Sequence, residues 1–124
     1  MLSAGVDIIE IERVGRAVTR WGGRFLNRVY TDAELAFCRG RLPELAVRFA
    51  AKEAISKALG TGLNGVSWRE MEVLPDRRGK PLVTLHGRAA KRASELGLTE
   101  FAISLSHSQE YAVAMVVGGQ GGKD

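Results

Sequence analysis

The segment from Pro43 to Gly60 constrains the fold more than any other part of the chain. Pro43 lies where the first turn of a helix would be, and a proline costs no hydrogen bond there because that N–H has no helical partner. Apolar residues recur at helical spacing from Leu45 to Leu59, and Gly60 follows the last of them, as is typical of a helix end. The sequence therefore predicts one long helix over 43–59.

The part of the chain before this helix carries signals for shorter elements. Two neighbouring glycines, Gly22 and Gly23, end one helical pattern. Thr31 and Glu34 have the spacing of a capping box, in which each side chain satisfies a backbone donor at the start of a helix. The elements predicted here are a strand over 1–11, helices over 12–21 and 24–29, and a helix that starts after Thr31.

The C-terminal half shows the alternation of apolar and polar residues that is typical of strands. Turn-forming residues join the strands in pairs, at Asp76–Gly79 and at Ser108–Glu110. The predicted elements are strands over 70–74, 81–85, 101–107 and 111–117 and a helix over 87–97. We therefore expect one α+β domain over residues 1–117, with a small, mostly antiparallel sheet of unknown strand order. A flexible glycine-rich tail is expected over 118–124.

Size and composition restrict the class of protein. The 124 residues fit one domain, and the 45% hydrophobic and 26% charged fractions are ordinary for a soluble globular protein. So small a domain encloses a deep cleft only at a high cost, which a site shared between subunits would avoid. No apolar run reaches the roughly 18–20 residues of a membrane-spanning helix, and no signal peptide is expected. The single cysteine, Cys38, fits a reducing cytoplasm.

The net charge of +4 indicates an anionic partner, which can be a nucleic acid, the phosphates of a nucleotide or an acidic protein. Arginines recur through the first two predicted helices, at Arg13, Arg16, Arg20, Arg24 and Arg28. Such a row is usually a solvated face, but acids are scarce around it, which favours an acidic docking partner. A nucleic acid fits less well, because few aromatic residues are interleaved and no RNA-binding signature is present.

Glu53 and Lys57 lie four residues apart in the long helix and therefore on one face of it. One interpretation is a surface ion pair, which stabilises a helix by a few tenths of a kcal/mol. Lys57 also precedes Gly60-Thr61-Gly62, and a glycine-rich loop can bring backbone N–H groups close to a phosphate. Because Gly-x-Gly after a helix is more often a cap, both interpretations stay open.

Asp7 stands in a β-branched run near the end of the first predicted strand, where an isolated buried carboxylate is costly. It could cap the helix that follows. It could also be an oxygen ligand of magnesium, which usually takes one or two carboxylates together with water and substrate phosphates. Asp7 and Glu53 would then suffice, although their spacing in the sequence carries no information.

Ser106 and His107 lie at the end of a predicted strand, with His107 on the same face as the apolar residues before it. A lone histidine on such a face is more often structural. It would be a general base only with an acid partner and a substrate hydroxyl nearby. Phosphate binding by the imidazole and the neighbouring hydroxyls is the alternative.

Three segments together resemble the short bacterial type of phosphopantetheinyl transferases, the holo-acyl-carrier-protein synthase family. They are Gly5-Val-Asp7 with Glu10, the run from Arg48-Phe-Ala-Ala-Lys-Glu53 through Lys57 to Gly62, and Ser104-Leu-Ser-His107. The segments occur in the expected order, and the resemblance extends from the N-terminus to about Val117.

This resemblance implies a magnesium-dependent enzyme. Such an enzyme transfers 4′-phosphopantetheine from coenzyme A to a serine of apo-acyl carrier protein in fatty acid biosynthesis, giving the holo-carrier and 3′,5′-ADP. Asp7 and Glu53 would bind Mg2+ and would form the catalytic group with Lys57. The implied coenzyme A contacts are Arg48, Lys57, Gly60, Thr61, Gly62, Pro81, Ser106 and His107. The implied carrier-docking residues are Arg13, Arg16, Arg20 and Arg24.

Short members of the family are homotrimers with active sites between subunits, so the same assembly is expected here. One position departs from the family pattern: some relatives have an acid after the Ser-His pair, where this chain has Ser108. A His–Asp dyad is therefore not expected, and the base is left open between a metal-linked water and a nearby carboxylate. The alternatives are a non-catalytic nucleotide- or RNA-binding module, and a transferase for carriers of secondary metabolism.

Overall fold

The computed structural model describes residues 1–121. The elements in chain order are β1 (Leu2–Glu10), α1 (Ile11–Trp21), α2 (Gly23–Val29), α3 (Asp32–Cys38), α4 (Leu42–Ala58), the 3-10 helix η1 (Trp68–Glu70), β2 (Met71–Pro75), β3 (Pro81–Leu85), α5 (Gly87–Leu96), β4 (Glu100–His107) and β5 (Tyr111–Gly119). Each predicted element is present, with ends shifted by one or two residues, so the α+β prediction is confirmed. In residues 1–121 no helix combines the length and the apolar character needed to cross a membrane.

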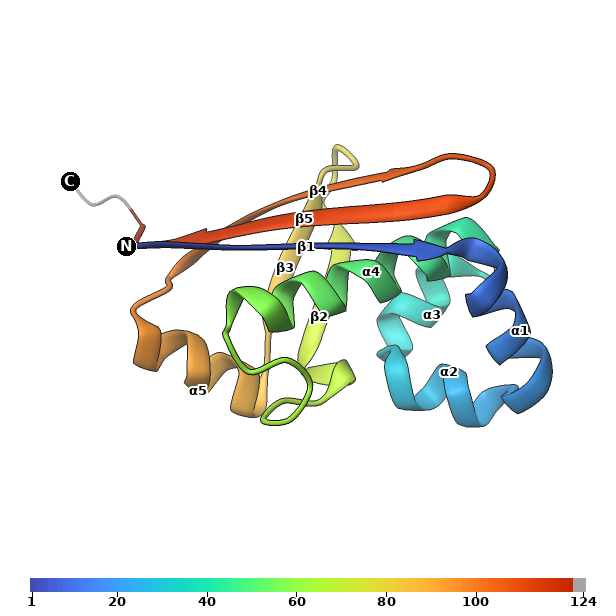
Figure 1. The fold of residues 1–124 in the computed structure, drawn as a ribbon, viewed down its shortest axis with the longest axis horizontal. Coiled ribbons are helices and arrows are strands. Elements are labelled where there is room, and N and C mark those ends of the chain that lie inside the picture. Colours follow the sequence, from blue (N-terminus) through green and yellow to red (C-terminus); the bar gives the residue numbers. More distant parts are fainter. Residues whose placement is uncertain (122–124) are drawn as a thin grey trace.

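The strands form two antiparallel groups. One sheet has the order β1-β5-β4, and β2 pairs with β3 in a separate hairpin. Figure 1 shows α4 running along one face of the three-stranded sheet, with the β2–β3 hairpin crossing behind it. The short helices α1, α2 and α3 gather at one end of α4, and α5 lies at the other. The long helix predicted from Pro43 is therefore the central element.

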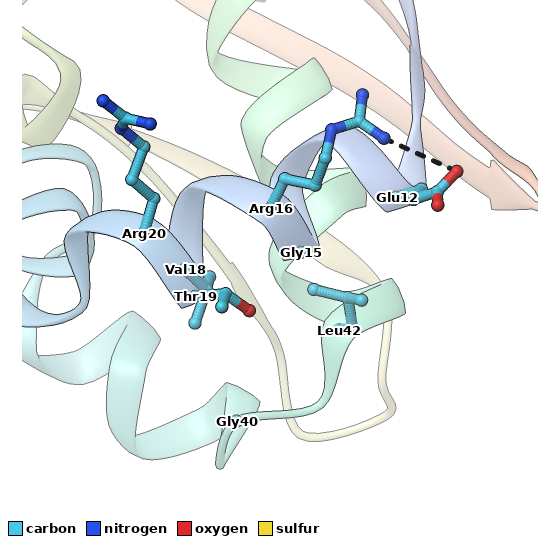
Figure 2. Close-up of a pocket in the computed structure, with 8 residues that line it drawn as sticks. All are labelled: Glu12, Gly15, Arg16, Val18, Thr19, Arg20, Gly40 and Leu42. Carbon is cyan, nitrogen blue, oxygen red and sulfur yellow. Dashed lines mark ion pairs between the residues drawn. The ribbon is translucent and has the colours of Figure 1, made fainter.

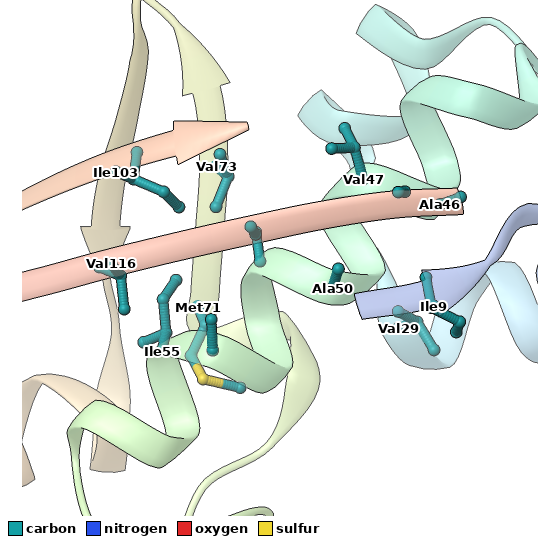
Figure 3. Close-up of a cluster of buried hydrophobic side chains, with 14 of the residues drawn as sticks. Ile9, Val29, Ala46, Val47, Ala50, Ile55, Met71, Val73, Ile103 and Val116 are labelled. Carbon is teal, nitrogen blue, oxygen red and sulfur yellow. The ribbon is translucent and has the colours of Figure 1, made fainter. Parts of the chain in front are cut away.

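β1 packs on α4 at unusually close range because both surfaces carry small residues. A Cβ atom on Gly5 would overlap the carbonyl oxygen of Ala54, so only glycine fits at this point of the strand. Ser3 donates a hydrogen bond from Oγ to the carbonyl oxygen of Ala58 one helical turn further on. Figure 3 shows part of the apolar core, with Ile55 of α4 near Val116 of β5 and Met71 of β2. The close approach fixes β1 along α4.

A buried ion pair ties α4 to the elements on its other side. Lys52 and Glu34 are both fully buried, and Lys52 Nζ lies 2.8 Å from Glu34 Oε1. Lys52 also donates to the carbonyl oxygens of Met71 (2.7 Å) and Trp68 (3.1 Å). Burial lowers the pKa of Lys52, and the carboxylate of Glu34 opposes that shift. Three donor–acceptor contacts thus compensate an ammonium group that has lost its water.

Glu34 also satisfies backbone donors. The predicted capping box is confirmed: Thr31 Oγ1 accepts from the N–H of Glu34, and Glu34 Oε1 accepts from the N–H of Thr31 at 2.9 Å. The other carboxylate oxygen, Oε2, accepts from the N–H of Val73 in β2 at 2.7 Å. One side chain therefore joins α3, α4 and β2.

The face of the three-stranded sheet that points away from α4 is apolar and open in the single chain. Side chains on this face alternate with those that contact α4, and Val6 of β1 stands opposite Met115 of β5. Its large apolar residues, between 44% and 78% exposed, are Leu2, Val6, Ile8, Tyr111 and Met115. A contiguous apolar surface of this kind on a soluble protein marks an interaction site.

The predicted boundary of the C-terminal tail needs a correction. β5 runs to Gly119, two residues beyond the predicted strand end at Val117. Gly118 stands opposite Phe101 of β4, and a Cβ there would lie 2.7 Å from the Phe101 ring. Gly118 and Gly119 are thus strand residues, and a side chain at either position would lie within 3 Å of a neighbouring side chain. Residues 122–124 of the predicted tail lie outside the described part.

We predict that Lys52→Met lowers the free energy of unfolding by about 3–5 kcal/mol, because it leaves the carboxylate of Glu34 charged and buried without its cation. Urea denaturation measures the change. The control is Lys91→Met on the exposed side of α5, which should alter stability by less than about 0.5 kcal/mol. A loss below about 1 kcal/mol for Lys52→Met would contradict the structural role of the pair.

Candidate active site

Asp7 and Glu53 come together although they lie far apart in the sequence. Asp7 follows Gly5 by two residues and therefore shares its face of β1, the face that meets α4. Glu53 directly precedes Ala54, the residue that Gly5 contacts. Burial raises the pKa of Glu53, and the negative charge of Asp7 raises it further, while Lys57 and Arg13 partly offset both effects. The predicted pair of acids is thus a real cluster.

Lys57 binds Asp7 and not Glu53. Its Nζ lies 3.0 Å from Asp7 Oδ1 and donates a second hydrogen bond, also 3.0 Å, to the carbonyl oxygen of Val6. The interpretation of Glu53 and Lys57 as a surface ion pair is therefore wrong. So is the interpretation of Asp7 as a helix cap, because Glu10 occupies the N-cap position of α1. Among residues 1–121, Glu53 has no ion-pair partner, and the carboxylate of Asp7 is held by Lys57.

The donor set of this cluster fits a magnesium ion that also binds a substrate. Within residues 1–121 no group of three or more His, Cys, Asp or Glu side chains could hold a metal. Asp7 and Glu53 would supply two carboxylates, and magnesium commonly completes such a set with water and phosphate oxygens. A cation between the two acids would also remove the repulsion that raises the pKa of Glu53.

The Gly60-Thr61-Gly62 loop caps the C-terminus of α4. The N–H of Gly60 donates to the carbonyl oxygen of Lys57, and the N–H groups of Thr61 and Gly62 both donate to that of Ser56. Gly60 and Gly62 have positive φ angles of 76° and 56°, which glycine adopts without strain. The cap interpretation is therefore confirmed, and these N–H groups are engaged within the chain. The loop lies directly after Lys57.

Arg92 lies beside this loop and was not singled out from the sequence. It donates from Nε to the carbonyl oxygen of Leu59 at 3.0 Å. The residue belongs to α5, which the sequence predicted only as a helix with no assigned role. Only the tertiary packing of α5 against the end of α4 places a guanidinium group there.

Arg48 is almost fully buried in the N-terminal half of α4. It donates to the carbonyl oxygen of Val73 (2.9 Å) and to Glu44 Oε1 (2.7 Å). It lines a cavity of about 330 Å3 together with Pro81 and Ser104. At about 1.5 Å rise per residue, Arg48 and Lys57 lie about 14 Å apart along the helix.

Ser106 and His107 lie at the end of β4, and alternation points them to opposite faces of the sheet. Ser106 stands opposite Val113, on the open apolar face, and His107 stands opposite Ala112. The ring of His107 is exposed and lies near the carbonyl oxygen of Ser108 (3.3 Å), with no acid partner among the described residues. Ser108 itself accepts from the N–H groups of Glu110 and Tyr111 and so builds the hairpin turn.

The predicted coenzyme A contacts therefore fall into three separate groups within one chain. Lys57 and the loop 60–62 lie at the end of α4, Arg48 and Pro81 share the 330 Å3 cavity, and Ser106 and His107 lie at the end of β4. Within residues 1–121, the cavity beside Arg48 is lined by Pro81 and Ser104 but not by Lys57 or His107.

The arginine row is exposed as predicted. Figure 2 shows Arg16 and Arg20 projecting from α1 beside a groove of about 690 Å3 that Gly40 and Leu42 complete. Arg16 contacts Glu12 at 3.5 Å. The positive charge of Arg13 partly offsets the raised pKa of Glu53, so the arginine row reaches the acid cluster. Arg24 continues it on α2.

An aromatic groove next to this row was missed. It has a volume of about 710 Å3, and its lining residues are Trp21, Arg24, Phe25, Arg28, Val29, Phe49 and Trp68. The Phe49 and Trp68 rings lie 4.7 Å apart. Phe49 looked like a core position of the long helix, and nothing local showed that Trp68 would come to lie against it.

We predict that Glu53→Gln stabilises the metal-free protein at neutral pH by roughly 0.2–0.5 kcal/mol, the size typical of neighbouring like charges on a helix. Because the pKa of Glu53 is raised on folding, its charge destabilises the fold above that pKa, and the cost disappears as the pH falls through it. Urea denaturation in EDTA at pH 7.5 and at about pH 4 measures the effect. Glu95→Gln on α5 is the control; a gain at pH 4 equal to that at pH 7.5 would contradict the prediction.

Comparison with known proteins agrees with the motifs. Residues 3–116 match the family model described as the 4′-phosphopantetheinyl transferase superfamily. A holo-[acyl-carrier-protein] synthase of Herpetosiphon aurantiacus is 54% identical over 125 residues, covering 95% of this chain and 98% of the relative. The enzyme of that name from Dehalococcoides mccartyi is 54% identical over 117 residues, covering 94% and 98%.

Solved structures agree as well. The Helicobacter pylori holo-[acyl-carrier-protein] synthase in complex with coenzyme A has a TM-score of 0.86 and 30% identity, covering 94% of this chain and 99% of that one. A synthase from Bacillus anthracis in complex with CoA (3′,5′-ADP) has a TM-score of 0.79 and 37% identity, covering 96% of both chains. The resemblance in motifs and fold is thus confirmed, and the chain belongs to the 4′-phosphopantetheinyl transferase superfamily.

Proposed function

We propose that this chain transfers 4′-phosphopantetheine from coenzyme A to a serine hydroxyl of apo-acyl carrier protein, giving the holo-carrier and 3′,5′-ADP. The observation that carries the proposal is the cluster of Asp7, Glu53 and Lys57 at the contact between β1 and α4. Relatives that match over almost their whole length are named for this reaction, and two similar structures contain coenzyme A or part of it. The carrier of fatty acid biosynthesis, in the cytoplasm, is the proposed acceptor.

Each residue of the cluster has a distinct task in this proposal. Asp7 and Glu53 would hold Mg2+, which when bound neutralises negative charge on the pyrophosphate of coenzyme A. Lys57 is half-exposed at the last turn of α4, where its ammonium can contact the phosphates. Asp7 is only 18% exposed, so the protein restricts the directions from which water reaches its carboxylate.

We propose that the active form is a homotrimer with sites between subunits. Two observations support it: the open face of the β1-β5-β4 sheet is apolar, and the predicted coenzyme A contacts are divided among three places in one chain. Burial of the exposed side chains of Val6, Ile8 and Met115 against a second subunit would remove apolar surface from water. Arg48 and Pro81 of one subunit would then complete the site around Lys57 of another.

The carrier would dock on the arginine row. Arg13, Arg16 and Arg20 on α1 and Arg24 on α2 form an exposed basic surface that ends at Glu53. An acidic helix of the carrier would bind there by charge complementarity, which raises the association rate and sets orientation. Its serine would then be delivered to the edge of the acid cluster.

The transfer itself is tested by incubating the protein with coenzyme A, Mg2+ and apo-acyl carrier protein. The carrier is expected to gain the mass of one phosphopantetheine. Asp7→Ala and Glu53→Ala should each reduce turnover at least about 100-fold, because each removes one proposed metal ligand. The control Glu95→Ala removes an exposed acid on α5 and should leave turnover unchanged. An unmodified carrier, or full turnover in either site variant, would refute the proposal.

The docking face is tested with Arg16→Glu combined with Arg20→Glu, two arginines that line the groove in Figure 2. We expect the KM for the carrier to rise at least about tenfold and the KM for coenzyme A to stay unchanged. A matched charge reversal, Lys91→Glu on the exposed side of α5, should change neither constant. Equal increases in both KM values would show that α1 does not bind the carrier.

A further inference from the structure

Lys57 forms an ion pair with Asp7, one of the two proposed metal ligands. We propose that its ammonium group is a resident counter-ion, which a divalent cation displaces from Asp7 and thereby releases toward the phosphates of the substrate. This exchange rests on the proposed function, since it assigns an order to the groups of that same site. It predicts that Lys57 opposes metal binding in the free enzyme and supports phosphate binding once the metal is present.

The ammonium group of Lys57 lies where it would interfere with a metal ion on Asp7. Nζ donates to two oxygens, Asp7 Oδ1 and the carbonyl oxygen of Val6, each at 3.0 Å. A magnesium ion lies about 2.0–2.1 Å from its ligand oxygens. An ammonium held on the same carboxylate would stand within a few ångströms of the ion and repel it strongly. Asp7 is mostly covered, so the ion has few other directions of approach.

The net charge of the cluster also favours exchange of the ammonium for a divalent cation. Two carboxylates and one ammonium leave the cluster of Asp7, Glu53 and Lys57 with one net negative charge. Glu53 has no ion-pair partner among residues 1–121, although Lys57 stands at the right spacing on the same helix. A divalent cation balances both acids at once, and the released ammonium is then a free positive charge beside an anionic substrate.

The position of Lys57 allows the movement. It lies in the last turn of α4, and its side chain is 53% exposed, so rotation about side-chain bonds can turn Nζ without any change in the backbone. Phosphate that draws Lys57 away from Asp7 also strengthens metal binding. By linkage, the factor equals the one by which the bound metal strengthens phosphate binding.

Metal binding without substrate tests the exchange directly. Mn2+ affinity is measured by electron paramagnetic resonance or calorimetry for the wild-type chain, Lys57→Met and Lys57→Gln, each first shown to have the wild-type circular dichroism spectrum. The ion pair is half-exposed, so both variants should bind Mn2+ about two- to fivefold more tightly than the wild type. Equal or weaker binding in both variants would overturn the proposal.

Arg13→Met is the matched control, because Arg13 also acts on Glu53 through its charge but makes no ion pair with Asp7. It should increase Mn2+ affinity by a smaller factor than Lys57→Met. An equal increase would overturn the exchange, since a general reduction of positive charge would then explain both results. Formation of the holo-carrier by the wild-type chain, together with unchanged Mn2+ affinity in Lys57→Met, would overturn the exchange and leave the transfer reaction standing.

A second readout follows the ammonium itself. In protein labelled with 15N on lysine side chains, the Lys57 resonance is assigned by its loss in Lys57→Gln. Addition of Mg2+ should shift this resonance while that of Lys91 on α5 stays in place. A Lys57 resonance that does not respond to saturating Mg2+ would show that its ammonium remains on Asp7 and would overturn the proposal.

Discussion

The contact of β1 with α4 at Gly5 and Ala54 is the constraint on which the site depends. A strand and a helix can approach this closely only where neither carries a side chain between them, and any Cβ on Gly5 would overlap the backbone of the helix. The contact fixes the position of β1 along α4, and with it the position of Asp7 relative to Glu53. Two like charges are held close together in the free protein, an arrangement that costs stability and is typical of functional sites.

The buried pair of Lys52 and Glu34 fixes the rotation of the same helix. Neighbouring residues of an α-helix point about 100° apart. Once Lys52 is held by Glu34 and by the carbonyl oxygen of Met71, Glu53 must point away from that side, toward β1. The Lys-Glu dipeptide thus joins a structural cation to the acid that is proposed to bind the metal. A change at Lys52 is expected to affect both the stability of the fold and the direction in which the Glu53 side chain points.

Local signals in the sequence predicted the elements well. Pro43, Gly60 and the capping box of Thr31 and Glu34 act within a few residues of themselves, so their effects can be derived without knowing the tertiary fold. The sequence did not reveal that Glu34 also neutralises Lys52, because that contact joins different elements. The order of the strands also depends on contacts between elements. So does the extension of β5 through Gly118, which packs against Phe101 of β4.

The candidate site likewise combines residues that the sequence predicted with contacts between elements that it did not reveal. The resemblance of three motifs identified Asp7, Glu53 and Lys57, but helical spacing alone paired Lys57 with the wrong acid. Asp7 lies 50 residues away from Lys57 and is its partner because β1 packs along α4. Arg92, Phe49 and Trp68 were missed for a related reason, since each gains its place near the site only through contacts between elements.

The central claim is that Asp7 and Glu53 share a divalent cation that faces the pyrophosphate of coenzyme A. Anomalous diffraction from crystals grown with Mn2+ and coenzyme A tests it most directly. The account predicts one strong anomalous peak between the two carboxylates, within about 2.5 Å of both and in contact with phosphate oxygens. A peak bound elsewhere, or coenzyme A seated with its pyrophosphate away from these two acids, would contradict it.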